Sequence, residues 1–337
     1  MKYTRRFPGY DGGQDVKFVA RCWWGDDQLE QNGYQRFFED CLGREPFPYQ
    51  SRLATAKPLP QFLNAPTGTG KTLAVLGTWL WRRFKGADDS HRLPRRLVYC
   101  LPLRTLVGQT VREARTFIDK AGLSDRVPVY VLMGGEKEDE WVLYPERECV
   151  IVGTQDMLLS RALNRGYAQS RYAWPRSFGL LNNDCFWVFD EVQLMSSALA
   201  TSAQLDGLRD RYGTVFPCSS LWMSATLCPS WFDVPDFRGG EGVVFSIDET
   251  DLAVPEIESR VQAVKTINAL TGLEGGAKYA TRVAEEVLGA HRDGTQTLVV
   301  LNTVERARKV YNAISRKLGK MKGSPKADLM LVHSRFR

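Results

Sequence analysis

One stretch of this sequence decides its fold: Ala65-Pro66-Thr67-Gly68-Thr69-Gly70-Lys71-Thr72. A short run with strand character, residues 61–65, leads into it, and a helical pattern, residues 71–84, leads out of it. Gly68 and Gly70 allow the backbone to turn tightly without a Cβ clash. The freed N–H groups and the helix N-terminus then point toward one spot, a geometry that binds phosphate. A Gly-Lys-Thr ending between a strand and a helix is typical of a P-loop.

Each part of this loop has an expected task. Lys71 would place its positive charge on the β- and γ-phosphates of ATP, and the Thr72 hydroxyl would bind Mg²⁺. The phosphate oxygens would be held by the backbone of Thr67, Gly68, Thr69 and Gly70. The alternative is a glycine-rich turn that binds nothing. The Gly-Lys-Thr ending and the strand–helix context together favour the nucleotide site.

A second part of the site is the run Phe186-Trp187-Val188-Phe189-Asp190-Glu191. Four apolar residues predict a buried strand, and two acids stand at its carboxyl end, where open α/β sheets bind ligands. We expect Asp190 to hold Mg²⁺ through water and Glu191 to orient the attacking water. The alternative is an acidic cap of the following helix, against which the upstream P-loop argues. A third motif, Ser224-Ala225-Thr226, is by itself a weak signal that usually marks a turn or cap. It supports a nucleotide site here because it follows the P-loop and the acidic pair in the chain.

The rest of the chain alternates between strand and helix patterns. Predicted strands cover residues 61–65, 97–101, 129–133, 150–154, 186–189 and 221–224. Predicted helices cover residues 71–84, 105–120, 155–164 and 197–211. This alternation indicates βαβ units, and therefore an α/β fold with a parallel sheet and helices on both faces.

The pattern also suggests four segments. Residues 1–45 form an N-terminal extension without a clear period, and residues 46–235 form the first domain. Residues 236–276 are rich in Pro, Gly and acidic residues and are expected to be a linker. Residues 277–337 repeat the alternation, with helices at 278–290 and 304–318 and strands at 297–301 and 329–333. That is about half of a parallel α/β domain and would leave an apolar face uncovered, so the chain is expected to be a fragment or to be completed by a partner.

Composition narrows the class of protein. The chain has 337 residues, 43% of them hydrophobic and 25% charged, which is the mix of a soluble globular protein. The net charge of +6 suits a polyanionic partner without requiring one. Seven scattered cysteines without a CxxC pair argue against a zinc knuckle and favour a reducing, cytoplasmic setting. The N-terminus has no apolar signal region and no run approaches a membrane span. Three isolated histidines cannot easily supply a metal-dependent nuclease site.

The ordered motifs resemble a superfamily 2 helicase, which implies RecA-like domains, ATP hydrolysis and nucleic-acid binding. Alanine at 65, in place of the first P-loop glycine, is a form common in helicases. Gln50, in Pro48-Tyr49-Gln50, matches the glutamine that reads the adenine edge. The other matches run in order along the chain: Leu101-Pro102-Leu103-Arg104-Thr105-Leu106 (motif Ia), Gly134-Gly135 (Ib), Gly153-Thr154-Gln155-Asp156 (Ic), Asp190-Glu191-Val192-Gln193 (II), Ser224-Ala225-Thr226 (III) and Val300-Leu301-Asn302-Thr303 (IV).

Three stretches narrow the resemblance to the CRISPR-associated helicase–nuclease of type I interference systems. They are Asp190-Glu191-Val192-Gln193-Leu194-Met195, Asn302-Thr303 before a basic helix, and His333-Ser334-Arg335-Phe336. The resemblance implies an antiviral role beside a guide-RNA effector complex and a nuclease domain or subunit. Two departures stand out. Gln193 replaces the family's usual histidine, and motifs V and VI, with the arginine finger, would lie beyond residue 333. Such a finger contributes about 10³–10⁵ in rate where it acts, which puts hydrolysis by this chain alone in doubt.

The resemblance further implies which residues meet the nucleic acid. Contacts to phosphate, which carry no sequence information, are expected from Arg104, Thr105, Gly134, Gly135 and Thr154, with Asn302 and Thr303 in the second domain. Ser224 and Thr226 are expected to couple hydrolysis to movement. Residues 161–178 mix arginines with aromatic residues, which suits either a single strand or a loop whose aromatics pack on the domain.

Three functions therefore stay open from the sequence. The chain is an ATP-driven helicase or translocase on single-stranded DNA, an RNA helicase or other superfamily 2 enzyme, or a truncated module that binds ATP and nucleic acid without activity of its own. Stimulation of hydrolysis by DNA or by RNA would separate the first two.

Overall fold

The computed structural model describes residues 26–85, 92–134, 136–137, 140–167, 169–239, 242, 244–264, 267, 269, 276, 278–319 and 328–332. The chain divides into two compact units, Met1–Ala263 and Val264–Arg337. The first unit has two hydrophobic clusters, and the second unit has a small one of its own.

The first unit is built on an eight-stranded sheet in the order β4-β3-β5-β2-β6-β7-β1-β8. The strands are β1 (Phe62–Asn64), β2 (Arg96–Leu101), β3 (Val129–Met133), β4 (Glu136–Lys137), β5 (Cys149–Thr154), β6 (Cys185–Phe189), β7 (Cys218–Ser224) and β8 (Val244–Ser246). All neighbouring pairs are parallel except the short antiparallel pair β3–β4. All six strands predicted for this unit are present, and β4 and β8 extend the sheet at its two edges.

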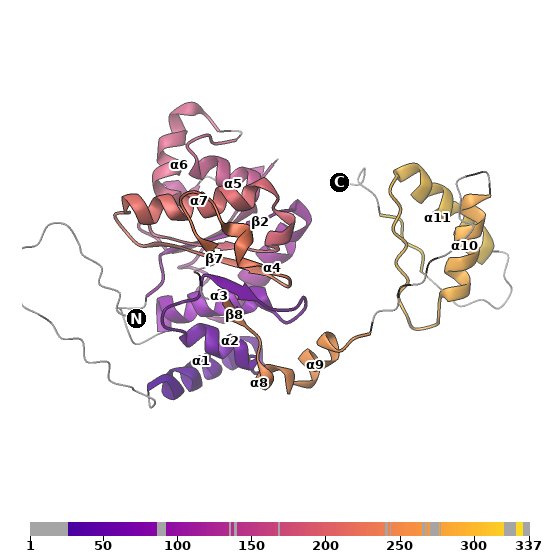
Figure 1. The fold of residues 1–337 in the computed structure, drawn as a ribbon, viewed down its shortest axis with the longest axis horizontal. Helices are drawn as coiled ribbons and strands as arrows, with labels where there is room; N and C mark the ends of the chain where they lie inside the picture. The colour runs from indigo at the N-terminus through magenta and orange to yellow at the C-terminus, as the bar shows by residue number, and fades with distance from the viewer. Residues whose placement is uncertain are drawn as a thin grey trace, which may run out of the picture. The chain divides into compact units, whose positions relative to one another are not determined.

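Helices cover both faces of this sheet (Figure 1). They are α1 (Asp26–Leu42), α2 (Pro48–Thr55), α3 (Lys71–Leu80), α4 (Arg104–Lys120), α5 (Gln155–Ala162), α6 (Trp174–Leu181), α7 (Ser197–Tyr212), α8 (Glu249–Leu252) and α9 (Pro255–Val261). The predicted α/β fold, a parallel sheet between two helical layers, is confirmed. No helix in the described part of the chain is both long and apolar enough to cross a bilayer.

Alternation along the strands sends buried side chains into two separate cores. Tyr99 and Val188 join the core beneath α1–α4, whereas Val98 and Trp187 join the core beneath α5–α7. The second core is rich in stacked aromatic rings, with the Phe189 and Trp222 centroids 5.8 Å apart. Because both faces are buried, the strands read as continuous apolar runs, as parallel strands do.

Described parts of the two segments assigned from the sequence to an extension and a linker belong to the first unit, which ends at Ala263. Within residues 1–45, α1 packs Tyr34, Phe37 and Phe38 into the core. The Phe37 ring stacks on Phe117 of α4 at 6.0 Å. Within residues 236–276, β8 pairs with β1, and α8 and α9 follow it. Aromatic residues in α1 and the exposed edge of β1 supply the physical reason, because each gains burial or backbone pairing by docking.

The second unit contains α10 (Tyr279–Ala290) and α11 (Val304–Leu318), joined by Val283, Ala284, Val310 and Ile314. The predicted strands at 297–301 and 329–333 are wrong for the described residues, none of which is assigned to a strand there. Val299 and Leu301 pack on the helices, whereas Leu298 and Val300 are more than 80% exposed. Buried and exposed side chains therefore alternate here as in a strand, although no sheet is formed. A strand needs a hydrogen-bonded neighbour, and neither segment has one among these residues. Residues 333–337 lie outside the described residues.

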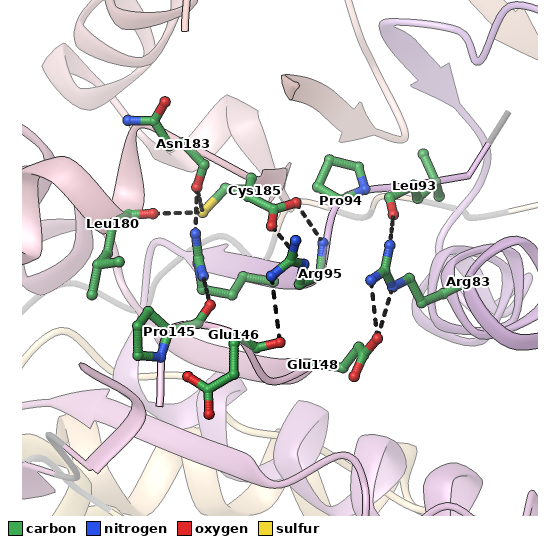
Figure 2. Close-up of polar contacts among 12 residues, drawn as sticks. Arg83, Leu93, Pro94, Arg95, Pro145, Glu146, Glu148, Leu180, Asn183 and Cys185 are labelled. Carbon is green, nitrogen blue, oxygen red and sulfur yellow. Dashed lines mark hydrogen bonds and ion pairs between the residues drawn. The ribbon is translucent and has the colours of Figure 1, made fainter. Parts of the chain in front are cut away.

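A polar network closes the amino-terminal edge of the first sheet (Figure 2). Arg95 forms an ion pair with Asp184 at 3.0 Å, and Arg83 binds Glu148 at 2.9 Å. Arg96, buried at the same edge, donates to the carbonyls of Pro145 and Asn183 at 2.7 and 2.6 Å. In open α/β sheets, ligands bind at the opposite side, where the carboxyl ends of the strands lie.

Candidate nucleotide-binding site

The P-loop connects the carboxyl end of β1 to the start of α3, as the sequence predicted. Gly68 and Gly70 both adopt the left-handed conformation, with φ of 82° and 78°. A Cβ on Gly70 would lie 3.0 Å from Nε2 of Gln50, so the position has both a conformational and a steric demand for glycine. The Thr69 hydroxyl donates to the Pro66 carbonyl at 2.8 Å and closes the turn. The loop is thus held in a tight curl whose helix begins at Lys71.

Lys71 joins the P-loop to the acidic motif. Its side chain is almost fully buried, and Nζ donates to the Ala65 carbonyl at 3.1 Å. The same Nζ lies 3.6 Å from Oε1 of Glu191. The two motifs, 120 positions apart in the chain, therefore meet at this ammonium group because β1 and β6 both end at this edge of the sheet.

Asp190 stands at the end of β6 in a buried setting. Its Oδ2 accepts a hydrogen bond from the Tyr99 hydroxyl at 2.9 Å, and its Oδ1 accepts one from the backbone N–H of Glu191 at 2.8 Å. Burial raises the pKa of Asp190 from 3.8 to about 6, an effect opposed by the charge of Lys71 and increased by that of Glu191. A buried carboxylate that is costly to ionise is one that a divalent cation would stabilise.

The raised pKa makes a prediction about stability. Without nucleotide or metal, ionisation of the buried Asp190 lowers the stability of the folded state. This penalty is fully present above about pH 6 and fades as the pH falls toward 3.8. Asp190→Asn removes it and keeps both hydrogen bonds, since an amide can accept from Glu191 and donate to Tyr99. We expect the variant to be more stable by about 2 kcal/mol at pH 7, seen as a melting temperature higher by about 4–8 °C.

The matched control is Asp125→Asn, an exposed carboxylate on a surface turn. Its melting temperature should follow that of the unchanged protein. The stabilisation in Asp190→Asn should shrink as the pH is lowered from 7 to about 5. A variant less stable than the unchanged protein at pH 7 would show that ionised Asp190 is well solvated or neutralised.

Glu191 and Gln193 form a relay toward the next strand. Glu191 adopts a left-handed conformation with φ of 51°, unusual for a residue with a side chain. Gln193 Nε2 donates to Glu191 Oε2 at 2.5 Å, and its Oε1 accepts from the Ser224 hydroxyl at 2.7 Å. The Ser224 hydroxyl in turn accepts from the backbone N–H of Thr226 at 3.0 Å. The amide thus bridges motif II and motif III with one donor and one acceptor, which glutamine supplies in a single side chain.

Helix α2 is fastened to the P-loop by two adjacent residues. Gln50 is 2% exposed; its Nε2 donates to the Gly70 carbonyl at 3.0 Å and its Oε1 accepts from the Phe47 N–H at 2.9 Å. The Tyr49 hydroxyl donates to the Thr69 carbonyl at 2.9 Å. These bonds use one donor and one acceptor of the Gln50 amide and leave a second of each. Its role toward adenine stays a prediction.

The structure gathers most of the expected nucleic-acid residues at one end of the sheet. Arg104 and Gly134 follow β2 and β3, and Thr154 is the last residue of β5; these three strands are adjacent in the sheet. Arg104 donates to the Gly134 carbonyl, and Thr105 is exposed beside it. Thr154 is 6% exposed, so its hydroxyl is not displayed. Gly135 lies outside the described residues.

Two further groups of residues were also candidates for contact with nucleic acid. Asn302 and Thr303 lie in the second unit, where Thr303 caps α11 by accepting from the Arg306 N–H at 3.2 Å. In the stretch 161–178, Arg161 is fully buried, whereas Tyr172 is 98% exposed. A buried arginine cannot contact a strand of nucleic acid, so only the exposed part of this stretch retains that possible role.

Comparison with known proteins agrees with this arrangement. Residues 50–233, more than half of the chain, match the family model described as DEAD/DEAH box helicase. The chain belongs to this helicase family. No curated protein matches it. Helicases of this family, in general, bind ATP and use it to unwind nucleic acid.

Solved helicase structures share the fold of this family member. The DUF1998 helicase MrfA bound to DNA is 17% identical with a TM-score of 0.55, over 84% of this chain and 38% of its own. The Mycobacterium smegmatis helicase Lhr bound to ssDNA and AMP-PNP is 18% identical with a TM-score of 0.53, over 85% of this chain and 36% of its own. At such identity the likeness shows the RecA-like helicase fold alone, and the chain spans well under half the length of either helicase.

Sequence reasoning missed two tyrosines of this DEAD/DEAH box site. Tyr99 lies at the middle of β2 and reaches Asp190, while Tyr49 reaches the P-loop backbone from α2. Burial raises the pKa of Tyr99, and the negative charge of Asp190 adds to the shift. A tyrosine in the middle of a predicted buried strand was the available signal, because a buried hydroxyl needs a partner.

Proposed function

We propose that this chain is the ATP-binding part of a motor that moves on single-stranded DNA. The observation that carries the proposal is the junction at the sheet's carboxyl edge, where Lys71 lies 3.6 Å from Glu191 and Gln193 links Glu191 to Ser224. One side of this junction is a phosphate site and the other is the motif expected to couple hydrolysis to movement. A protein that only binds nucleotide would not require the link from Glu191 through Gln193 to Ser224.

In the proposed mechanism, bound ATP replaces the contacts that Lys71 makes with the Ala65 carbonyl and with Glu191. The Ala65 carbonyl and Glu191 hold the Lys71 ammonium near where the phosphates would lie, so it would turn to them without crossing the site. Glu191 would then be free to orient and polarise the attacking water. Thr72 and Asp190 offer a hydroxyl and a carboxylate, the oxygen donors that Mg²⁺ prefers. When bound, that ion would neutralise charge that develops on the phosphates.

The relay from Glu191 through Gln193 to Ser224 and Thr226 is the proposed coupling path. Release of Glu191 from Lys71 changes the charge that the Gln193 amide senses at 2.5 Å. The Ser224 hydroxyl bonds Gln193 on one side and the Thr226 backbone on the other. A shift of Glu191 on hydrolysis would therefore reach the loop after β7.

The proposed nucleic-acid track is the neighbouring part of the same side of the sheet, at Arg104, Thr105 and Gly134. DNA is favoured because the sequence resembles a CRISPR-associated helicase, and MrfA and Lhr are solved with DNA. The assignment to a type I interference system, with a guide-RNA complex and a nuclease as partners, rests on the sequence resemblance alone. Another superfamily 2 activity, on RNA, is the second candidate.

Binding to single-stranded DNA should be weak, without sequence preference and strongly dependent on salt. With about three phosphate contacts, affinity should fall about 20-fold between about 50 and 200 mM salt, because each contact releases counterions. Arg104→Ala should make the slope of log affinity against log salt concentration shallower, by the amount that one phosphate contact contributes. Arg112 is an exposed arginine on the same helix, and Arg112→Ala should leave that slope unchanged. Fluorescence anisotropy with labelled oligonucleotides measures both.

The same oligonucleotides test the function itself. ATP hydrolysis should rise with single-stranded DNA more than with RNA of equal length and sequence. Stronger stimulation by RNA would replace the DNA assignment by the RNA alternative. ATP binding without any hydrolysis or strand separation would instead identify the chain as a module that binds ATP and nucleic acid without activity of its own.

A further inference from the structure

We infer that Arg260 of α9 is a nucleotide-binding residue that contacts the phosphates of ATP from outside the recognised motifs. The inference rests on the proposed function and names an additional residue of that site. A Cβ placed on Gly68 would lie 3.3 Å from Nε and 3.8 Å from Cζ of Arg260. The guanidinium group therefore lies directly against the curl of the P-loop, although the two residues are 192 positions apart in the chain.

The segment that carries Arg260 is anchored by a buried carboxylate. Asp251 of α8 is fully buried and accepts from the Tyr49 N–H at 2.6 Å and from Arg52 at 2.7 Å. Arg52 also pairs with Asp248 at 3.0 Å. Because Tyr49 itself bonds the P-loop, α8 is fastened to the same helix that holds the nucleotide loop.

Helix α9 continues from this anchor and determines where Arg260 lies. Pro255 opens the helix, and Ile257 is fully buried. Residues three positions apart share a helix face, so Arg260 lies one turn beyond Ile257 on the docked side. The segment that the sequence suggested as a linker therefore delivers a cation to the phosphate loop.

The charge of Arg260 is available to a ligand. Within the described residues it forms no ion pair and no hydrogen bond, although Glu256 and Glu258 are on the same helix. Its guanidinium offers planar, paired donors that match phosphate oxygens. Lys71 approaches the phosphates as a single point charge from inside the loop, so Arg260 would add a second cation on the outer side of the curl.

The test is competition for the site by three ligands in the complete 337-residue chain. ATP, ADP and inorganic tripolyphosphate would displace a fluorescent ADP analogue. Arg260→Ala should weaken ATP and tripolyphosphate by about the same factor, roughly tenfold, which is about 1.4 kcal/mol. Arg260→Lys should recover part of the loss, and Arg260→Glu should exceed it. Arg112→Ala, another exposed arginine, should bind all three ligands as the unchanged chain does.

The outcomes separate this inference from the proposed function. If the unchanged chain binds no ATP, the proposed function fails, and the inference fails with it. If the unchanged chain binds ATP and Arg260→Ala binds it equally well, only the inference is overturned. A loss for ATP with unchanged affinity for tripolyphosphate would overturn the phosphate contact, since the effect would then act on the base or ribose. Equal melting temperatures exclude misfolding as the cause.

Discussion

Lys71→Ala is expected to reduce the affinity for ATP by at least about 100-fold, which is about 2.7 kcal/mol. Lys71 is nearly buried, so its charge acts on phosphate with little solvent screening. The substitution has a second effect, because Lys71 is the charge that opposes the raised pKa of Asp190. Without it the pKa of Asp190 should rise further, and more of the carboxyl would be protonated near neutral pH and unavailable to Mg²⁺. Titration with a fluorescent ATP analogue, with and without Mg²⁺, measures both effects.

The control for this variant is Lys120→Ala, which removes an exposed charge at the end of α4. It should bind ATP as the unchanged chain does. If Lys71→Ala kept its affinity within about threefold, the phosphates would not lie at this loop, and the assignment of the site would be wrong. A melting temperature close to that of the unchanged chain shows that lost affinity is not lost folding.

Glu191→Gln is expected to keep ATP binding while slowing hydrolysis by about 10³-fold, the range that a general base supplies. Glutamate and glutamine adopt the left-handed backbone conformation at position 191 at about the same energetic cost, so the substitution should not cause misfolding for that reason. Glutamine can still accept the hydrogen bond that Gln193 donates to Glu191 Oε2. It cannot pair with Lys71, so affinity for ATP should be unchanged or higher. Phosphate release in the presence of single-stranded DNA measures the chemistry, and nucleotide titration measures the binding.

Glu146→Gln offers a matched control at the opposite edge of the sheet, where that carboxylate is exposed. It should hydrolyse ATP at the normal rate. Normal turnover by Glu191→Gln would mean that another residue positions the water. A loss of binding as large as the loss of turnover would mean that Glu191 mainly shapes the loop.

Some features of this protein follow from local patterns. The P-loop needs glycine at 68 and 70 and a lysine at 71, and these demands lie within eight consecutive residues. The strand that ends in Asp190 and Glu191 is similarly readable, because an apolar run predicts burial and the acids mark its carboxyl end. The prediction of a strand at residues 297–301 was wrong, because that segment packs on two helices without a strand to pair with. A pattern reports which side chains are buried, but strand pairing also needs a neighbour.

The sequence by itself determined the parallel α/β fold and the residues of the phosphate loop, because side-chain periodicity and backbone conformation act over a few residues. Only the tertiary structure decided which distant groups meet. It placed Tyr99 on Asp190, linked Gln193 to Ser224, and anchored α8 on Tyr49 through a buried carboxylate. Such contacts join residues up to about 200 positions apart. These contacts form because buried polar groups need hydrogen-bond partners in the folded chain. The spacing of residues along the sequence does not predict which partner each group will meet.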